Sequence, residues 1–254
     1  MVDIHSHILP GIDDGSTSME ISVEMLLMAA ESGTTDIVAT PHKNADYPYN
    51  EEVIAPLFRE LSEKFAGIIK LHLGCDFHLS LENIHEALAS PSKYTINGKG
   101  YLMSELPNLS SLGAMRSVFG RLIQRGITPV ITHPERVRAV QTQLDDIKEW
   151  IRDGCYMQVT AQSFMGRFGK RSQALAETLL DEDLVHFVAS DGHDTKDRIP
   201  VLKQAYDLVS RRWGVEKADA LFIKNPTAAL TGERIRSSPS PREKKTPLFS
   251  FLRR

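Results

Sequence analysis

The chain has 254 residues, of which 41% are hydrophobic and 25% are charged, and its formal net charge is −3. This length and composition are typical of one globular domain and argue against a disordered chain. The small net charge gives no global reason to expect nucleic acid as a partner.

The sequence also indicates where the protein works. No apolar stretch approaches the roughly 20 residues of a membrane span, and the first residues do not resemble a signal peptide, so we expect a cytoplasmic protein without a transmembrane segment. Cys75 and Cys155 are too few for a disulfide framework or a thiolate zinc site. A cysteine-dependent phosphatase also needs an arginine six residues after its cysteine, but here those positions are Leu81 and Ala161. Both cysteines are therefore expected to be buried and unreactive.

Short apolar, β-branched runs alternate with amphipathic stretches of helical length along the chain. This alternation is typical of repeated βα units around a parallel sheet. It predicts seven strands, at residues 2–5, 36–40, 69–74, 101–105, 128–132, 157–160 and 186–190. It predicts helices at residues 18–32, 50–65, 81–88, 110–125, 143–153, 171–180 and 196–212.

The composition predicts one domain followed by a tail. A single α/β barrel of about 200–250 residues would use nearly the whole chain. From Thr231 onward the composition shifts to Ser, Pro and basic residues, so we expect a domain over 1–232 and a flexible basic tail over 233–254. The simplest expectation is a solvated tail, and the alternative is peripheral docking to a membrane or acidic partner through Phe249 and Phe251.

Residues that can bind cations gather at the ends of the predicted strands. Parallel α/β barrels place their working residues at the carboxyl ends of the strands. The first strand ends in His5-Ser6-His7, a spacing that directs both imidazoles to one side of an extended segment. The loop after it and five further strands supply the other candidates. These are Asp14, His42, Asp76, Glu105, His133, Asp191 and His193.

Such a set indicates a metal cluster. Six of the seven predicted strands supply His, Asp or Glu at the same end, which scattered surface charges would rarely do. Imidazole and carboxylate ligands without thiolate favour Mn, Fe or Zn over a soft metal. Nine candidate ligands imply more than one ion.

The candidate residues fall into five motifs: Asp3-Ile4-His5-Ser6-His7, Asp13-Asp14-Gly15, Thr40-Pro41-His42, His133-Pro134-Glu135-Arg136 and Ser190-Asp191-Gly192-His193. Over about residues 1–230 they resemble the polymerase and histidinol phosphatase (PHP) superfamily. Within it, the second and fourth motifs are similar to the bacterial capsule and exopolysaccharide protein-tyrosine phosphatases. The resemblance implies an α/β fold of the PHP type, a distorted (β/α)7 barrel similar to a TIM barrel. It also implies metal-dependent hydrolysis of phosphotyrosine on the tail of a tyrosine kinase that controls capsule or exopolysaccharide synthesis.

The resemblance further implies three divalent ions, with Mn favoured over Fe or Zn, and roles for individual residues. The first ion would be held by His5, His7, Asp76 and Asp191, the second by Asp76, Glu105 and His133, and the third by Asp14, His42 and His193. Position 76 departs from the glutamate that is commoner in the family. Arg136 and Arg198 would bind the phosphate.

Several polar residues near these motifs are expected to have structural roles. Asp13 would shape the turn before Gly15. Glu135 would support a ligand or form a loop ion pair rather than bind a metal. The remaining histidines are expected at the surface or in the core, with His78 the candidate exception because it lies two residues after Asp76. These histidines are His72, His78, His85 and His186.

Three other functions stay open. One is a PHP phosphatase for a small phosphomonoester such as histidinol phosphate, and another is an amidohydrolase-type metal hydrolase, which also has His-x-His on its first strand. The third is a catalytically inactive module, against which the complete ligand set argues. Arg136 and Arg198, together with Asp14, His42 and His193, argue against the amidohydrolase. The sequence carries no signal for an oligomeric state.

Overall fold

The computed structural model describes residues 1–107 and 112–235, and there strands and helices alternate along the chain. The strands are β1 (Val2–Ser6), β2 (Asp36–Ala39), β3 (His42–Lys43), β4 (Lys70–Leu73), β5 (Asp76–His78), β6 (Tyr101–Glu105), β7 (Thr128–Thr132), β8 (Tyr156–Thr160) and β9 (Phe187–Ala189). The α-helices are α1 (Met19–Glu31), α2 (Glu51–Lys64), α3 (Leu81–Ala89), α4 (Met115–Gln124), α5 (Leu144–Asp153), α6 (Gly169–Asp181), α7 (Lys203–Trp213), α8 (Val215–Asp219) and α9 (Asn225–Thr231). Shorter helical turns are η1 (Ile96–Gly98), η2 (Pro134–Arg136), η3 (Val140–Thr142), η4 (Ala161–Met165) and η5 (Ala220–Lys224).

The strands form two parallel sheets, of order β1-β2-β4 and β3-β5-β6-β7-β8-β9. β3 follows β2 and β5 follows β4 after short breaks, and the backbone hydrogen bonds continue across the breaks, from Gly74 N to Ala39 O and from Asp76 N to Pro41 O. Pro41 has no N–H to donate, which explains an interruption here. All seven predicted strand positions are confirmed, and two of them continue into a second short strand.

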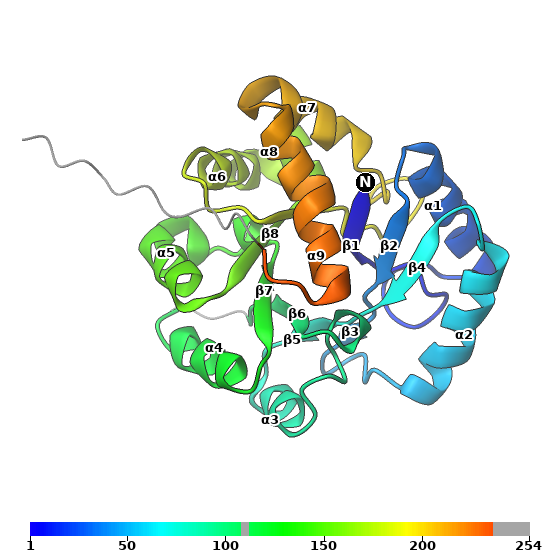
Figure 1. Cartoon of the computed structure of the whole chain (residues 1–254), viewed down its shortest axis with the longest axis horizontal. Coiled ribbons are helices and arrows are strands. Elements are labelled where there is room, and N and C mark those ends of the chain that lie inside the picture. The colour runs from blue at the N-terminus through cyan, green and yellow to red at the C-terminus, as the bar shows by residue number, and fades with distance from the viewer. Residues whose placement is uncertain (108–111, 236–254) are drawn as a thin grey trace, which may run out of the picture.

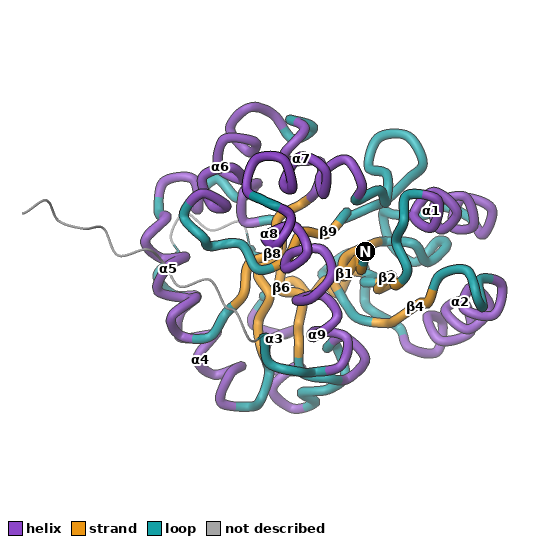
Figure 2. Tube along the Cα trace, turned by 45° about the horizontal axis from the view of Figure 1, so that its top comes forward, coloured by secondary structure: helices purple, strands orange, loops and turns teal. Residues whose placement is uncertain are grey.

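The fold is thus mixed α/β with parallel sheets. At the end of β1, Asp191 N donates to His5 O at 2.9 Å and His7 N to Gly192 O at 2.8 Å, which places β1 beside β9. Within the residues described, the ladders do not join into one closed sheet. Helices α1 to α7 lie around the outside of the strands (Figure 1), which run through the middle (Figure 2).

The last helices close one end of the strands. Apolar side chains of the strands, such as Ile4 of β1 and Phe187 of β9, form one buried cluster with Leu230 and Ile235. Helix α9 crosses the strands in Figure 1, and the hydroxyl of Tyr101 donates to Glu233 O at 2.7 Å. The predicted elements did not include α8 or α9. With this end covered, the carboxyl end of the strands remains for a site.

The C-terminal end of the domain lies slightly beyond its predicted boundary. Packing continues to the buried Ile235, a few residues beyond the predicted domain end at 232. The rest of the predicted tail, and the docking residues Phe249 and Phe251, lie outside the described residues. None of the helices in the described part combines the length and apolar character of a membrane span.

The predicted helix over 196–212 begins too early. Residues before α7 form a loop, because Asp194 Oδ1 accepts the backbone N–H groups of Lys196, Asp197 and Arg198, and Pro200 follows. A carboxylate that captures backbone donors in this way competes with helix formation. The loop brings Arg198 to the carboxyl end of the strands. The other predicted helices are confirmed, except that the predicted start at 110 lies outside the described residues and α4 begins at Met115.

Candidate metal centre

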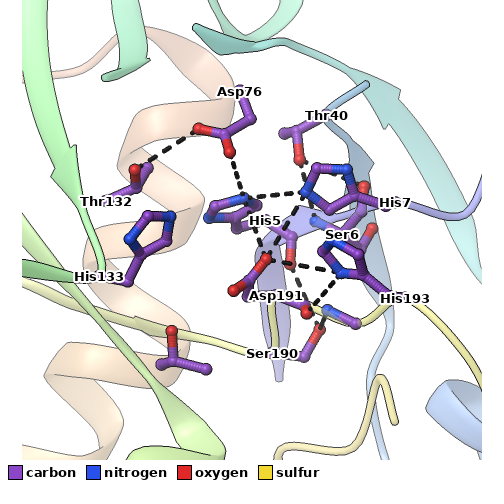
Figure 3. A network of polar contacts seen from close by, with 12 residues as sticks. His5, Ser6, His7, Thr40, Asp76, Thr132, His133, Ser190, Asp191 and His193 are labelled. Atoms are coloured by element: carbon purple, nitrogen blue, oxygen red, sulfur yellow. Dashed lines mark hydrogen bonds and ion pairs between the residues drawn. The ribbon is translucent and has the colours of Figure 1, made fainter. Parts of the chain in front are cut away.

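The end of β1 places two imidazoles side by side. His5 and His7 are buried and point to the same side of the strand (Figure 3), with their Nε2 atoms 3.3 Å apart. Ser6 between them donates its hydroxyl to Val38 O at 2.7 Å. The predicted common direction of the two imidazoles is confirmed.

Hydrogen bonds orient three imidazoles in this cluster. In each ring, Nδ1 faces an oxygen that can only accept, so Nδ1 carries a proton and Nε2 is the atom left to face the cluster. The pairs are His5 with Gln158 Oε1 at 3.0 Å, His7 with Asp13 Oδ2 at 2.8 Å, and His193 with Asp191 O at 2.9 Å. Histidines that bind metals are typically held in this way by a partner on the other ring nitrogen.

Asp76 lies between histidines from two strands. Its Oδ2 is 3.4 Å from His5 Nε2 and 3.4 Å from His42 Nδ1. Asp76 is buried, and within the described residues neither its Oδ2 nor His42 Nδ1 has a hydrogen-bond partner. A buried polar atom without a partner is costly. A cation shared by Asp76 and the two imidazoles would remove that cost.

Asp14 joins two further histidines at the open side of the cluster. Its Oδ1 is 3.3 Å from His42 Nε2 and 3.5 Å from His193 Nε2. The Asp14 side chain is 48% exposed, whereas His193 is buried. This group therefore lies where solvent and substrate can reach it.

Glu105 lies near two further histidines. Glu105 Oε1 is 4.0 Å from His133 Nε2, and Glu105 Oε2 is 3.4 Å from His78 Nδ1. His133 has φ 37° and Asp191 has φ 52°, left-handed conformations that are uncommon for residues with side chains. Both stand just after a strand, where such backbone strain tends to accompany function.

Three overlapping groups of ligand atoms, each within 4.8 Å, could hold cations. They consist of His7, Asp14, His42 and His193; of His5, His7 and Asp76; and of His42, Asp76 and Glu105. The resemblance implied His133 rather than His42 in the last group, added Asp191 to the second, and left His7 out of the first. All the atoms are nitrogen or oxygen donors, so the residues present fit divalent metal ions.

Two arginines converge on Asp191. Arg136 Nη2 and Arg198 Nη2 each lie 2.7 Å from Asp191 Oδ2, while Asp191 Oδ1 is 3.5 Å from His5 Nε2 and 3.6 Å from His7 Nε2. One carboxylate thus connects the guanidinium groups to the imidazole cluster. Arg198 Nε is buried and has no hydrogen-bond partner in the described part of the chain.

The charges in this cluster oppose the effect of burial. Burial alone would raise the pKa of Asp191, but Arg136, His5 and Arg198 hold it well below its usual range. Burial disfavours a charged His5, yet the carboxylates of Asp76 and Asp191 raise its pKa to about 9. Burial and the neighbouring His193 lower the pKa of His7 to about 4. The carboxylates therefore favour positive charge beside His5, and a metal ion can take the place of the proton.

Comparison with known proteins shows the family of this chain. The family model for capsular polysaccharide synthesis proteins CpsB/CapC matches residues 1–231. The chain belongs to this family. It is 33% identical to the tyrosine-protein phosphatase CpsB of Streptococcus pneumoniae, over 92% of this chain and 100% of that protein. It is also 33% identical to the putative tyrosine-protein phosphatase CapC of Staphylococcus aureus, over 99% and 100%.

A solved structure of the family supports the fold. It comes from crystal structures of YwqE from Bacillus subtilis and CpsB from Streptococcus pneumoniae, which are unique metal-dependent tyrosine phosphatases. The match has a TM-score of 0.86 and 29% sequence identity, and covers 96% of this chain and 100% of that one. The predicted relationship to the capsule and exopolysaccharide phosphatases is confirmed.

Three polar residues support the centre of this CpsB/CapC chain. Gln158, which the sequence analysis missed, holds His5; an amide inside a strand of buried residues was the available signal. Asp13 shapes the turn as predicted, since its Oδ1 accepts Gly15 N at 3.0 Å, and it also holds His7. Glu135 is buried and accepts from Thr160 N and the Ser163 hydroxyl, which ties the loop of His133 to β8. Glu135 forms no ion pair among the described residues, so of its two predicted roles the supporting one fits.

The histidines outside the motifs have the expected positions. His72 pairs with Asp36 at 2.9 Å, His85 is exposed on α3, and the buried His186 packs against Tyr156. His78 is the exception, because it lies beside Glu105 at the site. Cys75 and Cys155 are free and buried, as expected.

Replacing Gly15 by alanine is expected to weaken metal binding by about tenfold or more, as when a residue that orients a ligand is lost. A Cβ at position 15 would lie 2.3 Å from both His7 Cβ and His7 O, so the backbone of His7 must shift. Calorimetric titration with Mn²⁺ would measure the affinity.

Gly120→Ala is the matched control for Gly15→Ala. Gly120 lies in α4, where an added Cβ meets nothing within 4 Å. It should leave metal binding unchanged and raise stability by about 0.5–1 kcal/mol. Wild-type Mn²⁺ affinity in Gly15→Ala would show that this loop does not position His7.

Proposed function

We propose that this chain is a metal-dependent protein-tyrosine phosphatase that acts in the cytoplasm on the phosphotyrosine-bearing tail of a bacterial tyrosine kinase controlling capsule or exopolysaccharide synthesis. The observation that carries the proposal is the pair of guanidinium groups, Arg136 and Arg198, joined through Asp191 to the cluster of imidazoles and carboxylates. The names of the relatives and the description of the matching structure support it.

The proposed cofactors are three divalent cations, with Mn favoured over Fe or Zn. Their ligands would be His5, His7, Asp14, His42, Asp76, Glu105, His133, Asp191 and His193, with Asp76 shared between two ions. When bound, such ions lower the pKa of water and stabilise negative charge on phosphoryl oxygens. The orientation of His5, His7 and His193 by their Nδ1 partners prepares the ligand atoms before binding.

The two arginines would hold the phosphate. A guanidinium carries five N–H donors, so each can keep its bond to Asp191 and still donate to a phosphoryl oxygen. Both side chains are partly exposed, 20% for Arg136 and 26% for Arg198, so a phosphate can reach them. Donors already in place stabilise the charge that develops on the phosphoryl oxygens at little cost in reorganisation. A phenolate leaving group, with a pKa near 10, depends less on protonation than an alkoxide does, so we assign no general acid.

The strand order supports a finer description of the fold. We infer a distorted (β/α)7 barrel of the PHP type, in which β2 with β3 and β4 with β5 each fill one strand position. The hydrogen bonds between the ends of β1 and β9 support closure. We infer one domain over 1–232, with packing that continues to Ile235, followed by the basic tail.

Paired substrates test the proposed function. With Mn²⁺ present, kcat/KM should be higher for a phosphotyrosyl peptide than for histidinol phosphate, and a β-aspartyl dipeptide, as an amide substrate, should not be hydrolysed. Preference for histidinol phosphate would replace the proposal by a small-molecule phosphatase. Hydrolysis of the dipeptide without any phosphatase activity would point to the amidohydrolase reaction.

A further inference from the structure

A groove of about 580 Å³ lies between helix α6 and the chain that leads from η2 into α5. One of its walls bears Arg138, which follows η2, and the other bears Arg171 of α6. Apolar side chains, Leu144 and Leu175, complete it. None of the residues that line this groove is acidic. The groove therefore combines positive charge with an apolar surface.

Among the residues that the structure describes, the two arginines of the groove have no acidic partner. Both side chains are exposed, and neither forms an ion pair or hydrogen bond with another residue in the described ranges. Nearby Arg167 differs, because its Nη2 lies 2.6 Å from Asp197 Oδ1. Asp145 and Asp146 line an adjoining hollow, which shares Thr142 and Leu144 with the groove, but they do not line the groove itself. The groove itself is thus a local site for an anion.

The groove adjoins the proposed phosphate site. The guanidinium of Arg136 stacks on the ring of Phe168, 4.6 Å from its centroid, and Phe168 immediately precedes α6. Arg138 follows Arg136 by two residues, a span of at most about 7 Å along the backbone. An extended peptide advances about 3.3 Å per residue. A side chain roughly two to four residues from a bound phosphotyrosine can therefore reach the groove.

We propose that this groove binds a glutamate side chain of the phosphopeptide substrate, a few residues from the phosphotyrosine; this inference rests on the proposed function. Guanidinium groups match a carboxylate in geometry as well as charge. Leu144 and Leu175 offer an apolar surface to the methylene groups of glutamate. Arg138 and Arg171 then determine which phosphotyrosines are preferred, while Arg136 and Arg198 act on the phosphate.

Peptides with a single phosphotyrosine test this assignment. Glutamate or glutamine is placed at each of the positions up to four residues on either side, in an otherwise neutral sequence. At one or more positions on one side, glutamate is expected to lower KM about fivefold with kcat unchanged, as two partly exposed ion pairs would do. The double variant Arg138→Ala/Arg171→Ala should abolish this advantage, and about 0.5 M salt should reduce it.

The controls separate this inference from the proposed function. Arg59→Ala removes an exposed arginine of α2 and should keep the glutamate advantage. Hydrolysis of p-nitrophenyl phosphate should be the same in the double variant and wild type, since this substrate does not reach the groove. If wild type hydrolyses neither substrate, the proposed function fails, and anisotropy with labelled glutamate and glutamine peptides still tests the groove.

Three results would overturn the groove assignment. One is equal KM, or equal affinity, for glutamate and glutamine peptides at every position. Another is a glutamate advantage that survives in the double variant. The third is an advantage seen only when a second phosphotyrosine, and not glutamate, is placed beside the first, because the groove would then have a different occupant.

Discussion

Chelation of divalent cations is expected to reduce hydrolysis of phosphotyrosyl peptide to the level of a blank, and Mn²⁺ should restore it. The reason is the excess of carboxylate and imidazole groups at the strand ends, where Asp76 Oδ2 has no hydrogen-bond partner within the described residues. Without cations these groups supply no Lewis acid that could lower the pKa of water or stabilise the charge on a phosphoryl group. His5→Ala should have the same effect, because His5 lies 3.4 Å from Asp76 and 3.5 Å from Asp191.

The measurement for this prediction has two parts. Initial rates are compared with and without chelator, and the melting temperature is followed as Mn²⁺ is added. Binding to the folded state alone raises stability by about 2.7 kcal/mol at a hundred times the dissociation constant. His85→Ala is the matched control, since His85 is exposed on α3 and lies outside the motifs. Equal rates in all samples, with no shift in melting temperature, would remove the metal centre from the proposal.

Replacing Asp191 by asparagine is expected to lower kcat/KM for a phosphotyrosyl peptide by about 10²–10³-fold, the range seen when a preorganised charge is removed from a site. Its carboxylate is buried and contacts Arg136, Arg198, His5 and His7. The amide keeps the shape but cannot neutralise the two guanidinium groups. Because the arginines are partly exposed, the loss in stability should be only about 1–3 kcal/mol.

The choice of asparagine isolates the charge of Asp191. Position 191 has φ 52°, and asparagine and aspartate both tolerate this left-handed conformation, whereas other side chains do so less readily. Asp191→Ala should therefore lose more stability than Asp191→Asn, as measured by urea unfolding. Near-normal kcat/KM in a folded Asp191→Asn variant would mean that the contact between the arginines and the metal centre does not matter for the reaction.

The local residue patterns were sufficient to predict the repeated units. Strands buried on both faces have continuous apolar runs, and these runs identified all seven strand positions, including Tyr101–Glu105 and Thr128–Thr132. The last helix was predicted to begin too early, because apolar periodicity does not reveal the role of Asp194. Its carboxylate accepts the following backbone N–H groups and holds them in a loop. Helices α8 and α9 were missed, and their place across the strands depends on contacts distant in sequence, such as Tyr101 with Glu233.

The candidate ligands could be selected from the sequence for a similar reason. In parallel α/β folds the carboxyl ends of the strands lie at the same face, so His5, His42 and Asp191 could be grouped from the sequence alone. Residues that act by orienting another side chain need not stand at a strand end, so their position in the sequence does not reveal them. Gln158 and the second role of Asp13 became visible only when their contacts with His5 and His7 were in place.

The sequence by itself determined the order of the βα units, the family, and the identity of the imidazole and carboxylate groups at the strand ends, because these follow from local periodicity and short motifs. Only the tertiary structure decided how the groups combine. It grouped His42 with Asp76 and Glu105, joined both arginines to Asp191, and left Arg138 and Arg171 without acidic partners in the described part of the chain. Such distances depend on how separate loops pack against each other, which no local pattern encodes.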